Sequence, residues 1–421
     1  MYLKLLIISL CASLFSVHGM EIAELQSHLL LNHPLFQASQ LKKASLLESA
    51  NSVSSLPNPS IKIGIFPGDL VTRNGPVKSR FSASQAIPNP ATLKWKRKGM
   101  NALASVEKFN EKFLRFEAIR ELKIAYFEYW HLKKSIEIVQ DSLDLSKTWA
   151  DLIKAHYSYH NYLYPTLINL QIETLKLENQ IQSLESKRAV LSDQILNLAW
   201  LPGDEPLPWP TWSREVEEPP GLEVLKIEKS PKLLMLDARL ESQETRVELN
   251  KSRDSFSYQV GLEWSQITSD GFGTDPGKDS WMISAGAEIP LQRKAIHSRI
   301  KAEQLQKLAL QQERQVLLRE LTTTQQEYLV TLVDSIREIM LIQDNLLPKI
   351  SEAMNSLKST YQTGDVDYFS LLENLRLELK LNLDIAHHQR NYWQTLAKLE
   401  ALCGTSLFKE TRDLTPEQDT E

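Results

Sequence analysis

The stretch WMISAGAEIP, residues 281–290, and the segment that follows it decide how this chain folds. Its alternating side chains are typical of a β-strand with one apolar face. Residues 291–347 contain neither proline nor glycine, which predicts a very long helix. A turn signal, YQTGDVDYFSLLENL at 361–375, precedes a second helical run that ends at Gly404. The unit is therefore a strand, a long helix, a tight turn and a return helix.

The first half of the chain repeats this unit. The segment FSYQVGLEW (256–264) matches NPSIKIGIF (58–66), and Ile289-Pro290 repeats Ile87-Pro88. Three residues of the turn recur at one constant offset, namely Tyr361, Tyr368 and Leu371 after Tyr157, Tyr164 and Leu167. These matches predict two copies of a strand pair joined to a helical hairpin.

The repeat predicts the domain organisation. We expect a secretory signal at 1–19, a first repeat at 20–201, a Pro-rich linker at 202–222, a second repeat at 223–404 and a disordered tail at 405–421. Strands are expected at about 59–66, 79–87, 255–265 and 280–289, with helical hairpins at about 92–201 and 293–403. A turn-rich loop, PGDLVTRNGPVK at 67–78, is expected between the first two strands.

The first 19 residues have the order of a signal peptide, with Lys4 before an apolar run and small or permitted residues before Met20. Cys11 raises the alternative of lipidation. Leu10 argues against it, because leucine is too large for the position before the cysteine in a lipoprotein cleavage site. Removal of the signal would leave Cys403 as the single cysteine, so no internal disulfide is expected. No apolar run of about 20 residues follows Met20, so no transmembrane helix is expected.

The composition excludes several classes of function. The 421 residues carry a net charge of −5, which gives no general argument for nucleic acid binding. We find no P-loop, nucleotide fingerprint or catalytic triad. The chain is therefore expected not to be an enzyme and to need no cofactor.

The predicted strands of roughly ten residues are long enough to cross a bilayer when tilted. Four strands cannot close a barrel, and open edges are not tolerated in lipid, so three chains would have to share about twelve strands. The alternation alone leaves open a small soluble sheet with one buried face. Aromatic residues at the strand ends and the adjoining long helices favour the barrel. Lipid would then contact Ile63, Val260, Leu262 and Ile283, and the lumen would contact Lys62, Gln259 and Glu263.

At this point the sequence resembles the TolC-like outer-membrane efflux family over about residues 21–404. The repeat, the Ile-Pro before each long helix and the turn at 361–372 carry the resemblance. The short chain is more similar to the heavy-metal, CzcC-like branch. The resemblance implies a mainly α fold with a small antiparallel β part, and a homotrimer with a twelve-stranded outer-membrane barrel over a periplasmic helical tunnel. It also implies a passive duct that works with a periplasmic adaptor and an inner-membrane pump.

The resemblance also implies two sites. Alignment on Gly364 gives Glu373, Ser370 and Asn169 as candidates for the channel constriction. Candidates for the adaptor-docking tips are Tyr157, His160, Asn161, Tyr164, Tyr361, Gly364, Asp365, Asp367, Tyr368 and Leu371. Because Asn169 stands where the second repeat has Glu373, the constriction would hold fewer carboxylates than the family's usual pattern.

Other interpretations stay open. The nine histidines are scattered, and His387 and His388 are adjacent on a helix and would point about 100° apart, so no metal site is expected. A periplasmic adaptor also combines a helical hairpin with β-structure, but typically has one hairpin. A structural periplasmic coiled coil is the third possibility. The sequence does not reveal the cargo, the pump, the adaptor or whether several pumps share the duct.

Overall fold

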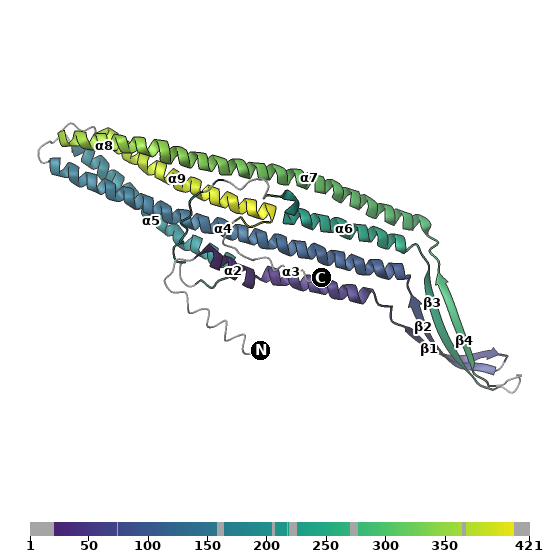
Figure 1. Cartoon of the computed structure of the whole chain (residues 1–421). Coiled ribbons are helices and arrows are strands. Elements are labelled where there is room, and N and C mark those ends of the chain that lie inside the picture. Colours follow the sequence, from purple (N-terminus) through teal and green to yellow (C-terminus); the bar gives the residue numbers. More distant parts are fainter. Residues whose placement is uncertain are drawn as a thin grey trace. The chain divides into compact units, whose positions relative to one another are not determined.

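A computed structural model describes residues 21–73, 75–157, 164–203, 207–216, 218, 225–269, 277–363 and 368–407. These residues form long helices and one antiparallel sheet (Figure 1). The predicted signal and most of the predicted tail lie outside them. No helix within these ranges is long and apolar enough to cross a membrane.

The helices and strands follow the predicted order of strand pair and hairpin, twice. The helices are α2 (Ile22–Asn32), α3 (Pro34–Val53), α4 (Pro90–Tyr157), α5 (Tyr164–Ala199), α6 (Pro231–Ser252), α7 (Arg293–Met340), α8 (Leu347–Thr363) and α9 (Tyr368–Cys403). The strands are β1 (Ser60–Thr72), β2 (Gly75–Ile87), β3 (Ser257–Ile267) and β4 (Ser280–Glu288). Proline is the first residue of α3, α4 and α6. At this position an N–H group would have no acceptor within the helix, so its absence from proline costs no helical hydrogen bond.

The chain divides into two compact units. Unit 1 comprises Met1–Gln37, Lys112–Pro231 and Leu318–Glu421, and unit 2 comprises Ala38–Glu111 and Lys232–Leu317. Unit 2 holds the sheet and the helical segments that connect to it. Unit 1 holds the predicted hairpin turns.

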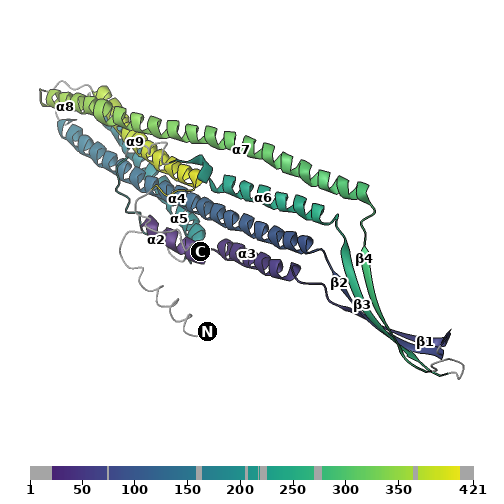
Figure 2. The same ribbon diagram turned by 45° about the vertical axis from the view of Figure 1, so that its right-hand side comes forward.

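In unit 2 the strands lie in the order β1-β2-β3-β4, each antiparallel to the next. The two repeats meet where β2 pairs with β3. The adjoining segments of α3, α4, α6 and α7 lie side by side in both views (Figures 1 and 2). Hydrogen bonds such as Ser39 Oγ to Glu107 Oε1 at 2.8 Å, between α3 and α4, join neighbouring helices.

The first hairpin is longer than expected, because most of the predicted loop at 67–78 belongs to β1 and β2. β1 continues to Thr72 and β2 begins at Gly75. The register shifts between Ile65 and Leu70, and this irregularity accommodates Pro67 in an edge strand, where a missing N–H is tolerated. The prediction of a loop was therefore wrong.

In unit 1 the two repeats share a core. Leu167 of α5 and its counterpart Leu371 of α9 belong to one buried cluster, with Trp149, Ile153, Leu170, Leu372 and Leu375. Part of the Pro-rich linker packs on α4, where the hydroxyl of Tyr129 donates to the Leu207 carbonyl at 2.8 Å and the Trp130 indole donates to the Trp212 carbonyl at 3.0 Å.

The predicted single helix after Leu291 is interrupted. A π-helical turn, Leu341–Leu346, separates α7 from α8 directly before Pro348. Proline removes a helical hydrogen bond and its ring clashes with the carbonyl four residues back. A π turn is one way to accommodate this conflict without ending the helix.

Candidate functional site

The sheet of unit 2 has one apolar face and one polar face. Two rows of residues cross all four strands on the apolar face. They are Ile61, Ala83, Leu262 and Ile283 in one row, and Ile63, Phe81, Trp264 and Trp281 in the next. Val260 lies on the same face, two residues from Leu262. The predicted lipid-facing residues therefore share a single face.

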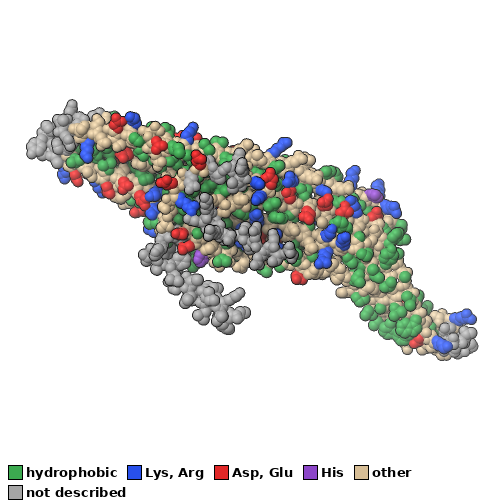
Figure 3. Space-filling model, viewed as in Figure 1, with side chains coloured by type: hydrophobic (Ala, Val, Ile, Leu, Met, Phe, Trp, Pro, Cys, Tyr) green, Lys and Arg blue, Asp and Glu red, His purple; other side chains and the backbone are tan. Residues whose placement is uncertain are grey.

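This apolar face is not covered by the described parts of the chain. Ile61, Ile63 and Ile283 are 74%, 64% and 85% exposed, and Trp281 is 68% exposed. Figure 3 shows hydrophobic side chains gathered over the strands of this unit. Contiguous apolar surfaces of this kind mark sites that contact protein or lipid.

Aromatic side chains form one border of the apolar face. The rings of Phe81 and Trp264 are stacked with centroids 5.3 Å apart, and those of Trp264 and Trp281 lie 6.3 Å apart. On the opposite face of the sheet, the Arg80 guanidinium lies over the Phe66 ring at 5.4 Å. Aromatic rings with a polar neighbour are typical of the level where lipid meets water.

The opposite face of the sheet is polar. Lys62, Ser82 and Glu263 lie in one row, and an Arg80–Glu263 ion pair spans β2 and β3 at 3.0 Å. The hydroxyls of Ser60 and Ser84 lie 2.8 Å apart. In the same row a Cβ added to Gly261 would lie 2.6 Å from Ser284 Oγ, so glycine leaves room for the serine. This face is suited to water.

The outer edges of β1 and β4 have no strand partner within the described ranges. Every residue of β4 is exposed. Unpaired edges present backbone N–H and C=O groups that can pair with another chain. Because β1 and β4 run in opposite directions, a second copy could add its β1 to this β4 and keep the antiparallel pattern.

The predicted docking tips are only partly described. Tyr157 ends α4, Tyr164 begins α5, Tyr361 lies near the end of α8 and Tyr368 begins α9. His160, Asn161, Gly364, Asp365 and Asp367 lie outside the described residues. Leu371 is 1% exposed and contributes to the core of unit 1.

The three constriction candidates lie on the helices that start from the predicted turns. Glu373 on α9 and Asn169 on α5 are exposed, and Ser370 is half-buried. The backbone carbonyl of Ser370 accepts from Asn374 Nδ2 at 2.8 Å. No hydrogen bond joins Glu373 to Asn169 among the described residues.

A pair that the sequence analysis missed lies beside these candidates. Arg376 Nη2 on α9 is 2.6 Å from Glu173 Oε2 on α5, which joins the two repeats. The hydrogen bond from Arg376, with the positive charges of Arg376 and Lys176, lowers the pKa of Glu173 in spite of burial. Glu173 lies four residues after Asn169 and Arg376 three after Glu373, a helical spacing that could have indicated a shared face.

In the part of the chain that the structure describes, no group of three or more His, Cys, Asp or Glu side chains lies close enough to hold a metal ion. The rings of His387 and His388 are 5.6 Å apart and nearly perpendicular, at 85°. His387 Nδ1 lies 2.9 Å from Arg390 Nη2, a cation that disfavours a bound metal ion.

No protein-family model matches this sequence, and no curated protein matches it. The fold is nevertheless similar to solved structures. The outer membrane protein VceC from Vibrio cholerae matches with a TM-score of 0.73 and 12% identity over 91% of this chain and 96% of its own. CusC, a protein that forms a transmembrane channel, matches with a TM-score of 0.75 and 13% identity over 94% of this chain and 96% of its own. The open state of the MtrE outer membrane channel of Neisseria gonorrhoeae matches with a TM-score of 0.71 and 13% identity over 93% and 91%. The chain therefore has, over nearly its full length, the fold of these outer-membrane proteins.

Proposed function

We propose that this protein is a TolC-like outer-membrane channel, the passive duct of a tripartite efflux system. The observation that carries the proposal is the exposed apolar face of a four-stranded sheet with two open edges. A soluble sheet of this size would bury such a face. The fold shared with VceC, CusC and MtrE supports the same conclusion.

The assembly that we propose is a homotrimer. One chain supplies four strands, which is fewer than the smallest closed transmembrane barrel of about eight. Pairing the edge of β4 with β1 of the next copy removes both open edges and keeps all strands antiparallel. Two copies would give eight strands and three would give twelve. The resemblance to the TolC-like family favours three.

We propose that the helices form a periplasmic tunnel whose turns around His160 and Gly364 dock an adaptor protein coupled to an inner-membrane pump. Docking at these turns predicts that cross-linkers at Asn161 and Asp365 capture a periplasmic partner during efflux. A failure to capture any partner in cells that carry out efflux would contradict docking there. Glu373, Ser370 and Asn169 are the proposed constriction.

A narrower proposal is the heavy-metal branch, which rests on the length of the chain. It predicts that cells lacking this protein become sensitive to divalent metal ions and keep their tolerance of drugs. Sensitivity to drugs alone would instead favour the drug-efflux branch.

The competing functions are a periplasmic adaptor and a structural coiled coil. Fractionation of cells, followed by gels of heated and unheated samples, distinguishes them. A channel is expected in the outer membrane as a trimer that dissociates on heating and conducts ions in planar bilayers. A soluble periplasmic monomer, or a trimer with no conductance, would refute the channel.

A further inference from the structure

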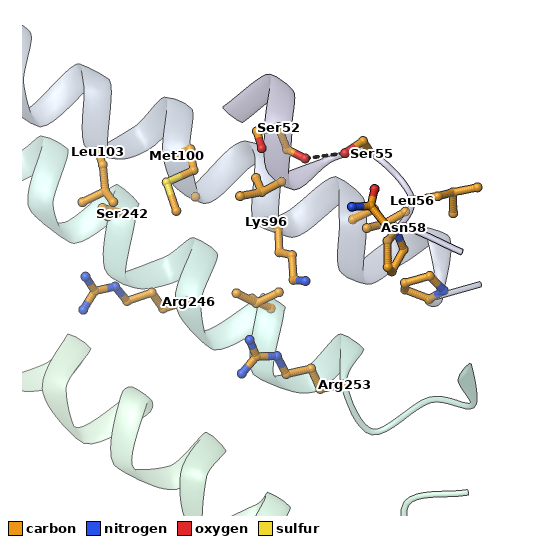
Figure 4. A pocket seen from close by; sticks show the side chains of 16 residues that line it. Ser52, Ser55, Leu56, Asn58, Lys96, Met100, Leu103, Ser242, Arg246 and Arg253 are labelled. Atoms are coloured by element: carbon orange, nitrogen blue, oxygen red, sulfur yellow. Dashed lines mark hydrogen bonds between the residues drawn. The ribbon is translucent and has the colours of Figure 1, made fainter. Parts of the chain in front are cut away.

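Unit 2 contains a groove beside the strand ends, with a volume of about 620 Å³. It lies among the end of α3, the start of α4 and the last turns of α6 (Figure 4). Asn58 and Pro88, at the ends of β1 and β2, line it together with Arg253, four residues before β3. The groove therefore lies where the strands give way to helices.

Three cations line this groove, namely Lys96, Arg246 and Arg253, and no carboxylate does. Figure 4 shows Lys96 extending from α4 towards α6, and Arg253 at the end of α6. Lys96 is half-buried and the two arginines are exposed. None of the three has an ion pair with any residue that the structure describes, whereas the neighbouring Lys251 pairs with Glu248 at 2.6 Å. Three unpaired cations around one groove favour an anionic ligand.

The surrounding sequence strengthens the positive potential. Lys94, Arg97 and Lys98 flank Lys96 at the start of α4, and no acidic residue occurs in that helix before Glu107. On α6, Glu248 is paired with Lys251, and Asp254 follows Arg253; on α3, Glu48 lies one turn before Ser52 and does not line the groove. A negative group in the groove would thus meet a net positive field.

The rest of the lining is largely apolar. Leu93, Met100 and Leu103 of α4 lie opposite Leu249 of α6, and Val53 and Leu56 come from the end of α3 and the segment after it. A free phosphate ion would use only the cations. A ligand that also has a hydrocarbon chain would use both kinds of surface.

We propose that the groove binds a phospholipid, with the anionic phosphate held by Lys96, Arg246 and Arg253 and the first part of an acyl chain packed along the leucines. This inference rests on the proposed function, because the apolar face of the sheet begins at Ile61, Ile87 and Tyr258, next to the groove. If that face lies in lipid, the strand ends lie at the level of the phosphate groups.

The test is a lipid titration of the assembled, delipidated protein in detergent, followed by native mass spectrometry. The probes are phosphatidylglycerol, phosphatidylcholine and inorganic phosphate. We expect phosphatidylglycerol to bind in preference to phosphatidylcholine and to resist displacement by inorganic phosphate. Displacement by millimolar phosphate would show a site for free anions and would overturn the lipid assignment.

The test variant is Lys96→Gln/Arg246→Gln/Arg253→Gln. The control is Arg293→Gln/Lys294→Gln/Lys301→Gln, which removes three exposed cations from α7 of the same unit. The test variant should weaken phosphatidylglycerol binding about tenfold or more, equivalent to about 1.4 kcal/mol, while the control stays within about twofold of wild type. Equal losses in both variants would show diffuse charge rather than a site, and would overturn the proposal.

Failure of the groove is distinguishable from failure of the channel. A test variant that binds lipid like wild type, in a protein that conducts ions in bilayers, refutes the groove alone. A wild-type protein that never conducts refutes the channel, whatever the lipid titration gives.

Discussion

Leu262→Arg is the substitution that most directly tests whether the apolar face of the sheet lies in lipid. Leu262 is the middle residue of β3, with five residues of the strand on either side, and its neighbours on the same face are Ala83 and Ile283. In a membrane this position lies within the apolar band, one row from the aromatic border, and arginine there costs up to about 2–4 kcal/mol per copy, the cost at the midplane. Three copies in one trimer would add to at most about 6–12 kcal/mol. On a water-exposed sheet the change would stay within about 0.5 kcal/mol.

The matched control is Ser284→Arg. Ser284 is the middle residue of β4 and lies on the polar face, in the row of Gly261. The assay is urea unfolding of the protein refolded into phospholipid vesicles, with the yield of heat-dissociable trimer as a second measure. We expect Leu262→Arg to lose most of the trimer and Ser284→Arg to retain it. If both variants fold as wild type does, or if Ser284→Arg is the damaged one, the assignment of the faces is refuted.

Four further predictions concern unit 1. Glu373→Gln should change single-channel conductance or its block by divalent cations in planar bilayers, because three copies near one axis would concentrate negative charge. Unchanged conductance and unchanged block in a normal trimer would remove Glu373 from the constriction. Lys123→Met should destabilise the protein by about 3–5 kcal/mol in denaturant titrations, because Lys123 and Glu400 form a buried ion pair with side chains only 4% and 5% exposed. The double variant Lys123→Met/Glu400→Leu should be less destabilised than Lys123→Met, and a loss at least as large would contradict a cost due to the Glu400 charge that Lys123 no longer balances. Gly404→Ala should lower the stability by about 1–3 kcal/mol, since Gly404 has φ +65° and a Cβ there would lie 2.7 Å from Pro231 Cδ; an unchanged melting temperature would show that the chain relaxes around it. Burial and the positive charge of Arg390 lower the pKa of His131 from 6.5 to about 4, although the negative charge of Glu128 opposes this shift. Between these two pH values His131 is therefore neutral in the folded protein and protonated in the unfolded chain. The contribution of neutral His131 to stability is thus full above about pH 6.5 and is lost as the pH falls towards 4. His131→Gln should therefore reduce the fall of the melting temperature over this pH range. An identical pH profile in wild type and variant would contradict the assignment.

The sequence predicted the features that depend on neighbours along the chain. Alternation assigned Ile63, Val260, Leu262 and Ile283 to one face and Glu263 to the other, because successive side chains of a strand point to opposite faces. Ile87-Pro88 marked the end of β2, after which α4 begins at Pro90. The repeat placed Leu167 and Leu371 in equivalent positions, and both belong to one cluster.

Predictions from local signals were less accurate where the chain could compensate for them. Pro67 and Gly68 indicated a loop, but pairing on one side of β1 and a shift of register kept them within the strand. Residues 291–347, which lack proline and glycine, indicated one unbroken helix. The structure instead has a π turn at Leu341–Leu346, shortly before Pro348.

What the sequence by itself determined is the element order, the two-fold repeat and the two faces of each strand, because these follow from periods of two and 3.6 residues and from proline and glycine. The tertiary structure alone decided which distant side chains meet. The Glu173–Arg376 pair joins residues 203 positions apart, and the Lys123–Glu400 pair joins residues 277 positions apart. The groove of Lys96, Arg246 and Arg253 likewise requires α4 and α6 to lie next to each other. Such contacts depend on the rotation and register of whole helices, and no local pattern specifies either of them.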